Sequence, residues 1–115
     1  MAQMDGDTRF FRRLATLFLA GAPEKMGAIR AAVESGCSED LVKLSHELRG
    51  SAANFFAEPA VAAASRLEAM ARRADLTEAP PAYRELVGLM EQLERELAHL
   101  IESEDLDRLV STSSN

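Results

Sequence analysis

Apolar residues recur along the N-terminal part of the chain at the spacing of an amphipathic helix. The first such stretch covers residues 8–20, and its apolar positions at i, i+4, i+7 and i+8 are Phe10, Leu14, Leu17 and Phe18. Gly21 is suited to end a helix and Pro23 to begin one, because glycine favours the C′ position and proline tolerates the first turn. The pattern therefore predicts a short first helix and a separate second helix over residues 23–34.

Three further amphipathic stretches follow, each bounded by turn signals. Ser35-Gly36 is placed to end the second helix, and the next helices are predicted over residues 38–56, 58–74 and 82–102. The short connections favour antiparallel neighbours. We expect an all-α fold, an antiparallel up-down four-helix bundle with the short additional N-terminal helix capping one end. In this division residues 1–7 are an N-terminal extension, residues 8–102 the bundle, and residues 103–115 a flexible polar tail.

Composition supports a helical class and excludes several functions. The chain is 47% hydrophobic and 5% aromatic, and it lacks tryptophan. The net charge of −6 argues against a nucleic-acid partner, which needs a basic surface. Cys37 is the single cysteine, which excludes an intrachain disulfide and a cysteine metal cluster. No apolar run is long enough for a membrane span and no secretory signal is visible, so a cytoplasmic protein without a membrane partner is expected.

His46 is predicted to lie on the outer side of the helix over residues 38–56. Leu44 and Leu48, two residues away on either side, belong to the apolar stripe of that helix. At about 100° per residue, His46 points roughly 200° away from each of them, so its imidazole should be exposed. The residues that share its face are Val42, Lys43, Arg49, Gly50 and Ala53.

The neighbours of His46 suit a site that carries a phosphoryl group. Arg49 offers a permanent charge and paired donors for phosphoryl oxygens, and Lys43 adds a second cation. Gly50 is unfavourable inside a helix by about 1 kcal/mol relative to alanine, which a cleared approach to the imidazole would explain. Alternatives stay open on these residues alone. A lone surface histidine usually has no special role, as we expect for His99, and an unrelated helical interaction module could carry His46 incidentally.

The segment S-H-E-L-R-G-S-A-A-N-F-F over residues 45–56 resembles the signature of histidine-containing phosphotransfer (HPt) domains, approximately H-x-L-K/R-G-S/A-x-x-x-x-G. An F-L-x-x-A-P-E-like segment at residues 18–24 and the pair Leu67-Glu68 extend the similarity to about residues 8–102. Phe56, where glycine is common in the family, and Pro59 depart from the pattern. These departures bear on the end of the helix rather than on His46.

The resemblance implies a phosphocarrier rather than a self-contained enzyme. In the family, the histidine accepts a phosphoryl group from an aspartyl phosphate on one receiver domain and passes it to an aspartate on another. For this chain it implies His46 as the phosphorylated residue, Arg49 as the stabiliser of phosphoryl charge and Gly50 as the source of clearance. No kinase activity is expected, and the chain has no GxxxxGK[ST] phosphate loop. No cofactor or metal is expected on this chain, and the Mg²⁺ of the reaction belongs to the receiver.

The implied partners are receiver domains of response regulators and of a hybrid sensor histidine kinase. Docking is expected to be transient and to use Lys43, Val42 and Ala53. Phe11, off the core stripe of its helix, is a further predicted anchor, although it could instead pack beneath the neighbouring helix. We expect a monomer. The competing function is a phosphorylation-independent helical adaptor with the same fold.

Overall fold

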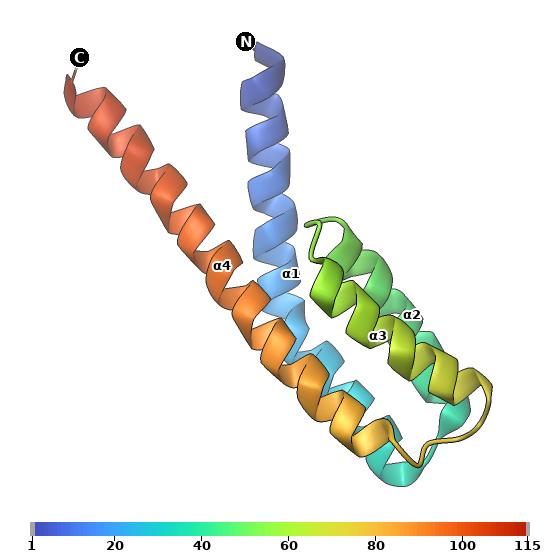
Figure 1. The fold of residues 1–115 in the computed structure, drawn as a ribbon. Coiled ribbons are helices and arrows are strands. Elements are labelled where there is room, and N and C mark those ends of the chain that lie inside the picture. The colour runs from blue at the N-terminus through green and yellow to red at the C-terminus, as the bar shows by residue number, and fades with distance from the viewer. Residues whose placement is uncertain (1, 115) are drawn as a thin grey trace.

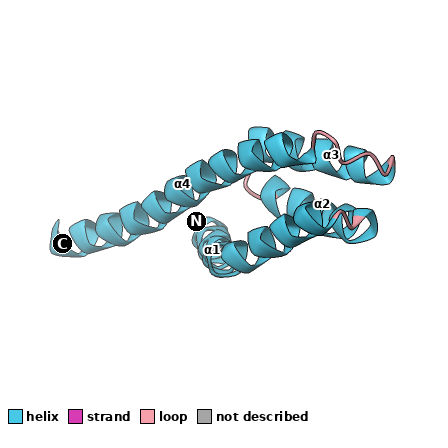
Figure 2. Ribbon diagram, turned by 90° about the horizontal axis from the view of Figure 1, so that it is seen from below, coloured by secondary structure: helices cyan, strands magenta, loops and turns pink. Residues whose placement is uncertain are grey.

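The computed structural model describes the backbone of residues 2–114 and the side chains of residues 9–102. Its helices are α1 (Ala2–Ser35), α2 (Ser38–Ala53), α3 (Glu58–Arg72) and α4 (Ala79–Ser114). Helices that follow one another along the chain pack together, and α1 also packs against α4, which closes the bundle. Figure 2 shows helices joined by short loops, and Figure 1 shows the short α2–α3 hairpin lying against the two longer helices. The predicted all-α class is confirmed.

The core is a continuous set of aliphatic side chains contributed by every helix. The largest fully buried apolar residues are Ile29, Leu41, Leu48, Leu67, Leu86 and Met90. Small residues let the hairpin helices approach closely, since Ala52, Ala60, Ala63 and Ala64 are at most 2% exposed. This tight α2–α3 contact positions the functional site, because it fixes which α3 side chain lies beside His46.

The predicted short N-terminal capping helix was wrong. Gly21 and Pro23 both lie inside α1, which is one helix of 34 residues. The core stripe runs through them without interruption, since Phe18, Ala22 and Ile29 are all buried. Burial of this stripe outweighs the loss of the hydrogen bond that Pro23 cannot donate, and Pro23 itself lies on the exposed side of α1. α1 changes direction partway along its length in Figure 1, as expected for a helix with an internal proline.

The last helix also differs from its predicted bounds. α4 begins at Ala79, so Pro80 and Pro81 occupy its first turn instead of the preceding loop. It continues beyond Glu102 through Ser114. The side chains of residues 1–8 and 103–115 lie outside the described residues, and the division into extension, bundle and flexible tail stays a prediction.

Three helices are followed by a residue in the left-handed backbone region. These are Gly36 after α1 (φ 70°), Phe56 after α2 (φ 55°) and Ala74 after α3 (φ 55°). The predicted stop at Gly36 is confirmed, and glycine adopts this conformation without steric penalty. At Phe56 the same conformation is unfavourable by roughly 1 kcal/mol.

Among the residues that the structure describes, no helix is long and apolar enough to cross a membrane.

Candidate phosphohistidine site

His46 lies midway along α2 on its outer face, and its side chain is 59% exposed. Leu48, two residues further along, is fully buried, and Leu44 packs partly against the core. The exposure predicted from the helical pattern is therefore confirmed. The imidazole is open to a partner, while the core stripe beneath it fixes the position of its backbone.

A buried carboxylate on α3 lies beneath the imidazole. Glu68 is only 6% exposed, and its Oε2 lies 3.3 Å from Nδ1 of His46. Arg49 Nε donates to Glu68 Oε1 at 2.9 Å, and Arg49 Nη2 lies 2.9 Å from the same Nδ1. Arg72, one turn along α3, donates from Nε and Nη2 to Oε2 at 3.1 and 2.7 Å. We call His46, Arg49, Glu68 and Arg72 the His46 cluster.

The charge of Glu68 is set by these donors. Burial alone would raise the pKa of its carboxyl group, but hydrogen bonds from Arg72, His46 and Arg49 outweigh burial and lower that pKa below its ordinary value. Glu68 is therefore a carboxylate at neutral pH. A buried carboxylate is stable here because donors from both helices occupy both of its oxygens.

The tautomer of His46 decides which contact at Nδ1 is a hydrogen bond. If Nδ1 carries the proton, it donates to Glu68 Oε2 and the lone pair lies on Nε2. If Nδ1 is unprotonated, it accepts from Arg49 Nη2 and Nε2 carries the proton. Only the first tautomer makes Nε2 a nucleophile. It also releases Nη2 of Arg49 from the imidazole, so that this donor can turn towards an incoming group.

Gly50 is exposed on α2, one turn from His46. A Cβ added at this position would meet no atom within 4 Å. Packing within this chain therefore does not require glycine here, although glycine is unfavourable inside a helix by about 1 kcal/mol. The open space beside Gly50 is compatible with a requirement imposed by a partner.

The predicted partner-binding residues are not all on one surface. Lys43 and Ala53 are exposed on α2, and Val42 is half-buried against the core. Phe11 is half-buried and packs edge-on against Phe55, with ring centroids 5.6 Å apart. Phe11 also lines a cavity towards α4, so the structure does not place it on the His46 face.

Glu68 and Arg72 were not predicted from the sequence as members of the site. Glu68 was named only in the Leu67-Glu68 pair that extends the family resemblance, and Arg72 was not named. A stronger signal was available, because Glu68 continues the buried stripe formed by Ala64, Leu67 and Ala71. A carboxylate within an apolar stripe requires partners from a neighbouring helix.

Comparison with known proteins agrees with this geometry. The helical bundle presents an exposed, hydrogen-bonded histidine on one helix. The family model of the Hpt domain matches residues 13–103, and this chain belongs to the Hpt domain family. Its role is histidine phosphotransfer in a phosphorelay, and proteins of this family interact with receiver domains.

A solved structure has the same fold. The crystal structure of histidine-containing phosphotransfer protein B (HptB) from Pseudomonas aeruginosa PAO1 superposes with a TM-score of 0.81 and 19% sequence identity, covering 89% of each chain. At that identity the similarity establishes the bundle fold alone. No curated protein sequence matches this chain.

Proposed function

We propose that this protein accepts a phosphoryl group on Nε2 of His46 from an aspartyl phosphate of one receiver domain and passes it to an aspartate of another. The observation that carries the proposal is the His46 cluster. It holds Nδ1 of an exposed imidazole against a buried carboxylate, and no hydrogen bond to Nε2 is found among the described residues. The direction of flow depends on the partners.

The chemistry follows from the Nδ1-protonated tautomer. The Nε2 lone pair forms the N–P bond as the P–O bond to the donor aspartate breaks, and that aspartate leaves as a carboxylate. The phosphorylated ring then carries positive charge with its proton still on Nδ1, where the Glu68 carboxylate stabilises it. Arg49 turns its Nη2 towards the phosphoryl oxygens while its Nε stays on Glu68. Transfer onwards reverses these steps, and the Mg²⁺ belongs to the receiver.

Clearance and docking residues surround the histidine. Gly50 gives the receiver's catalytic pocket room, and Lys43, Val42 and Ala53 are contacts on the same helix. A shallow groove between α1 and α2 extends this surface, with Leu14, Leu17, Lys25, Ser51 and Asn54 along it. Leu17 is 63% exposed, and Lys25 Nζ donates to Ser51 Oγ at 3.3 Å. An exposed apolar side chain beside a cation suits a transient acidic partner such as a receiver's active-site face.

The test is phosphoryl acceptance from purified phosphorylated receiver domains. We expect acid-labile, base-stable phosphate on the wild-type chain and none on His46→Gln. Failure to label with several receivers, while each receiver still binds, would instead favour the phosphorylation-independent adaptor. Label that persists in His46→Gln would contradict the assignment of the carrier residue.

A further inference from the structure

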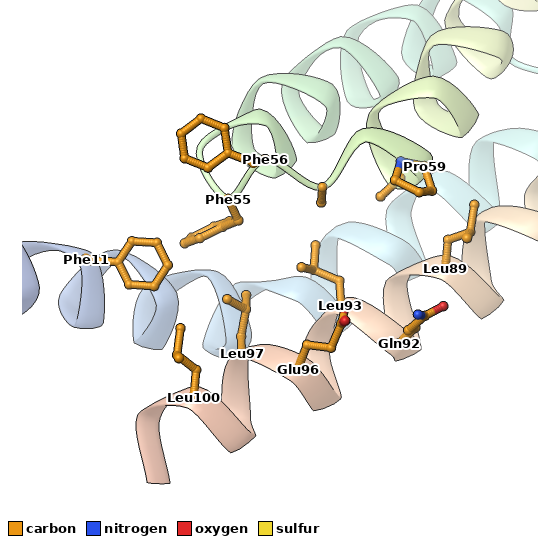
Figure 3. A pocket seen from close by; sticks show the side chains of 12 residues that line it. Phe11, Phe55, Phe56, Pro59, Leu89, Gln92, Leu93, Glu96, Leu97 and Leu100 are labelled. Atoms are coloured by element: carbon orange, nitrogen blue, oxygen red, sulfur yellow. The ribbon is translucent and has the colours of Figure 1, made fainter. Parts of the chain in front are cut away.

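The charged groups around His46 come from α2 and α3. Arg49 and Lys43 lie on its own helix, and Glu68 and Arg72 lie on α3. Among the described residues, no charged group of α1 or α4 makes a hydrogen bond or ion pair with the imidazole. Where α1 and α4 approach the α2–α3 turn, they line instead the mainly apolar cavity of Figure 3, which contains no member of the His46 cluster. The charge around the imidazole is therefore set by the α2–α3 hairpin.

A carboxylate beside an imidazole has two opposing effects. Glu68 Oε2, 3.3 Å from Nδ1 of His46, favours a proton on Nδ1 and so leaves the lone pair on Nε2. The same negative charge also favours a second proton on the ring, and an imidazolium has no lone pair with which to attack phosphorus. The carboxylate therefore supports transfer only if a positive charge offsets it while it stays beside Nδ1.

Arg72 is better placed than Arg49 to supply this positive charge throughout transfer. Arg49 is the residue that turns towards the phosphoryl oxygens in the function proposed above. Arg72 lies one turn after Glu68 on α3 and donates to Oε2 of Glu68 at 2.7 Å from Nη2 and 3.1 Å from Nε. Burial raises the pKa of Glu68, and the hydrogen bond from Arg72 is the largest of the effects that lower it. Arg72 can therefore stay with the carboxylate when Arg49 turns away from the imidazole.

We infer that Arg72 is a positioning residue for phosphoryl transfer, which holds the Glu68 carboxylate beside Nδ1 and offsets its charge so that Nε2 of His46 keeps its lone pair. This inference rests on the function proposed for His46. It assigns different tasks to the two arginines of the His46 cluster, because Arg49 engages the phosphoryl group and Arg72 acts through Glu68.

Loss of Arg72 should let the His46–Glu68 pair take up a proton more readily. If that proton is on the imidazole, both ring nitrogens are protonated. If it is on the carboxyl group, the O–H donates to Nδ1 and the ring proton lies on Nε2. Nε2 has no lone pair in either case, so the expected result does not depend on how the pair shares its proton.

The pH profile of phosphoryl acceptance tests the role of Arg72. Relative to the wild type, Arg72→Gln should accept the group about threefold or more slowly at about pH 6.5, and the deficit should largely disappear at about pH 8.5, where the pair has lost the extra proton. The ratio of variant to wild type at each pH cancels the receiver's own pH dependence. Arg72→Lys should restore most of the rate, because it keeps the positive charge.

The matched control is Arg66→Gln. Arg66 lies on the same helix, its side chain is 48% exposed against 60% for Arg72, and it pairs with Glu85 of α4 instead of Glu68. Its replacement removes the same charge from the chain and one interhelical ion pair. The ratio for Arg66→Gln should be the same at both pH values, whereas an arginine that only stabilises the helix would leave no pH dependence at Arg72 either.

Nitrogen NMR of the unphosphorylated chain gives a second measurement that needs no receiver. At about pH 6.5 the fraction of His46 with a protonated Nε2 should be larger in Arg72→Gln than in the wild type, while His99 should be unchanged. Equal fractions and equal pH profiles in the two proteins would overturn the inference, as would an identical shift in Arg66→Gln. A wild-type chain that accepts no phosphoryl group would refute the proposed function instead, and the NMR comparison would still decide whether Arg72 controls the protonation of His46.

Discussion

The two histidines of this chain are both exposed on helices, yet only one has surroundings that suit chemistry. His46 on α2 lies over the buried Glu68 and beside Arg49. His99 is exposed on α4, and no hydrogen bond or ion pair to its side chain is found among the described side chains. The difference arises from packing, because α3 lies against α2 and brings a carboxylate beneath one imidazole.

This comparison shows that exposure alone does not make a site. An exposed imidazole can adopt either neutral tautomer, so either nitrogen can carry the lone pair. Glu68 beside Nδ1 favours the tautomer that leaves the lone pair on Nε2, whereas Arg49 Nη2, 2.9 Å from the same Nδ1, favours the other one. The cluster therefore combines an accessible imidazole with a carboxylate that selects the nucleophilic tautomer once Arg49 turns towards the phosphoryl group.

Removal of each histidine should give the largest contrast. His46→Gln is expected to abolish phosphoryl acceptance, while His99→Gln should accept the group at the wild-type rate. The measurement is the mass of the intact protein after incubation with a phosphorylated receiver. A shared loss in both variants would point to a defect in folding or docking rather than to a carrier histidine.

A bulky side chain at Gly50 should slow transfer without unfolding the helix. We expect Gly50→Gln to reduce the rate about tenfold to a hundredfold, because a small displacement of reacting groups has a large kinetic effect. Gly88→Gln is the matched control, since Gly88 is also a helical, exposed glycine with open space where its Cβ would lie. Stopped-flow transfer rates and circular dichroism would be compared. Equal rates for the two variants would refute the role of clearance.

Neutralising Glu68 should affect both transfer and stability. Glu68→Gln keeps an acceptor for Nδ1–H but removes the charge that stabilises the phosphorylated ring, so transfer should slow about tenfold. It also removes charge-assisted hydrogen bonds from two partly exposed arginines, which should lower the free energy of unfolding by about 1 kcal/mol.

The stability effect of Glu68 should depend on pH. Because the folded state lowers the pKa of Glu68, its stabilisation is fully present above the pKa of the unfolded chain and is lost as pH falls through the folded pKa. Urea unfolding of the wild type and Glu68→Gln should therefore differ at pH 7 and converge in acid. A difference that persists undiminished in strong acid would show that the carboxylate charge is not its source.

Ser45 provides the smallest predicted effect and a contrast to Glu68 within the same hairpin. Its hydroxyl is fully buried next to His46 in sequence, and no hydrogen-bond partner is found for it among the described residues. Ser45→Ala should raise the free energy of unfolding by about 1 kcal/mol, since an unpaired buried hydroxyl is unfavourable and alanine favours helix. Thermal unfolding would detect the increase. A decrease would mean that the hydroxyl has a partner after all.

The sequence predicted the elements whose local pattern and packing agree. The exposure of His46 followed from its position relative to Leu44 and Leu48, and the stop at Gly36 followed from its backbone freedom. The continuity of α1 could not be predicted in this way, because the helix-ending and helix-starting signals at Gly21 and Pro23 oppose the apolar core stripe. Only tertiary packing decides between them. Glu68 was missed as a site residue because its place beside His46 depends on the register between α2 and α3. No spacing within one helix reveals that register.

Nitrogen NMR of the imidazole would test the central claim most directly. The chain, labelled with ¹⁵N at histidine, would be phosphorylated by a receiver and its ring nitrogen shifts recorded. We predict that Nε2 of His46 bears the phosphoryl group, that Nδ1 keeps its proton, and that His99 is unchanged. A phosphoryl group on Nδ1, or on His99, would contradict the role assigned to the His46 cluster.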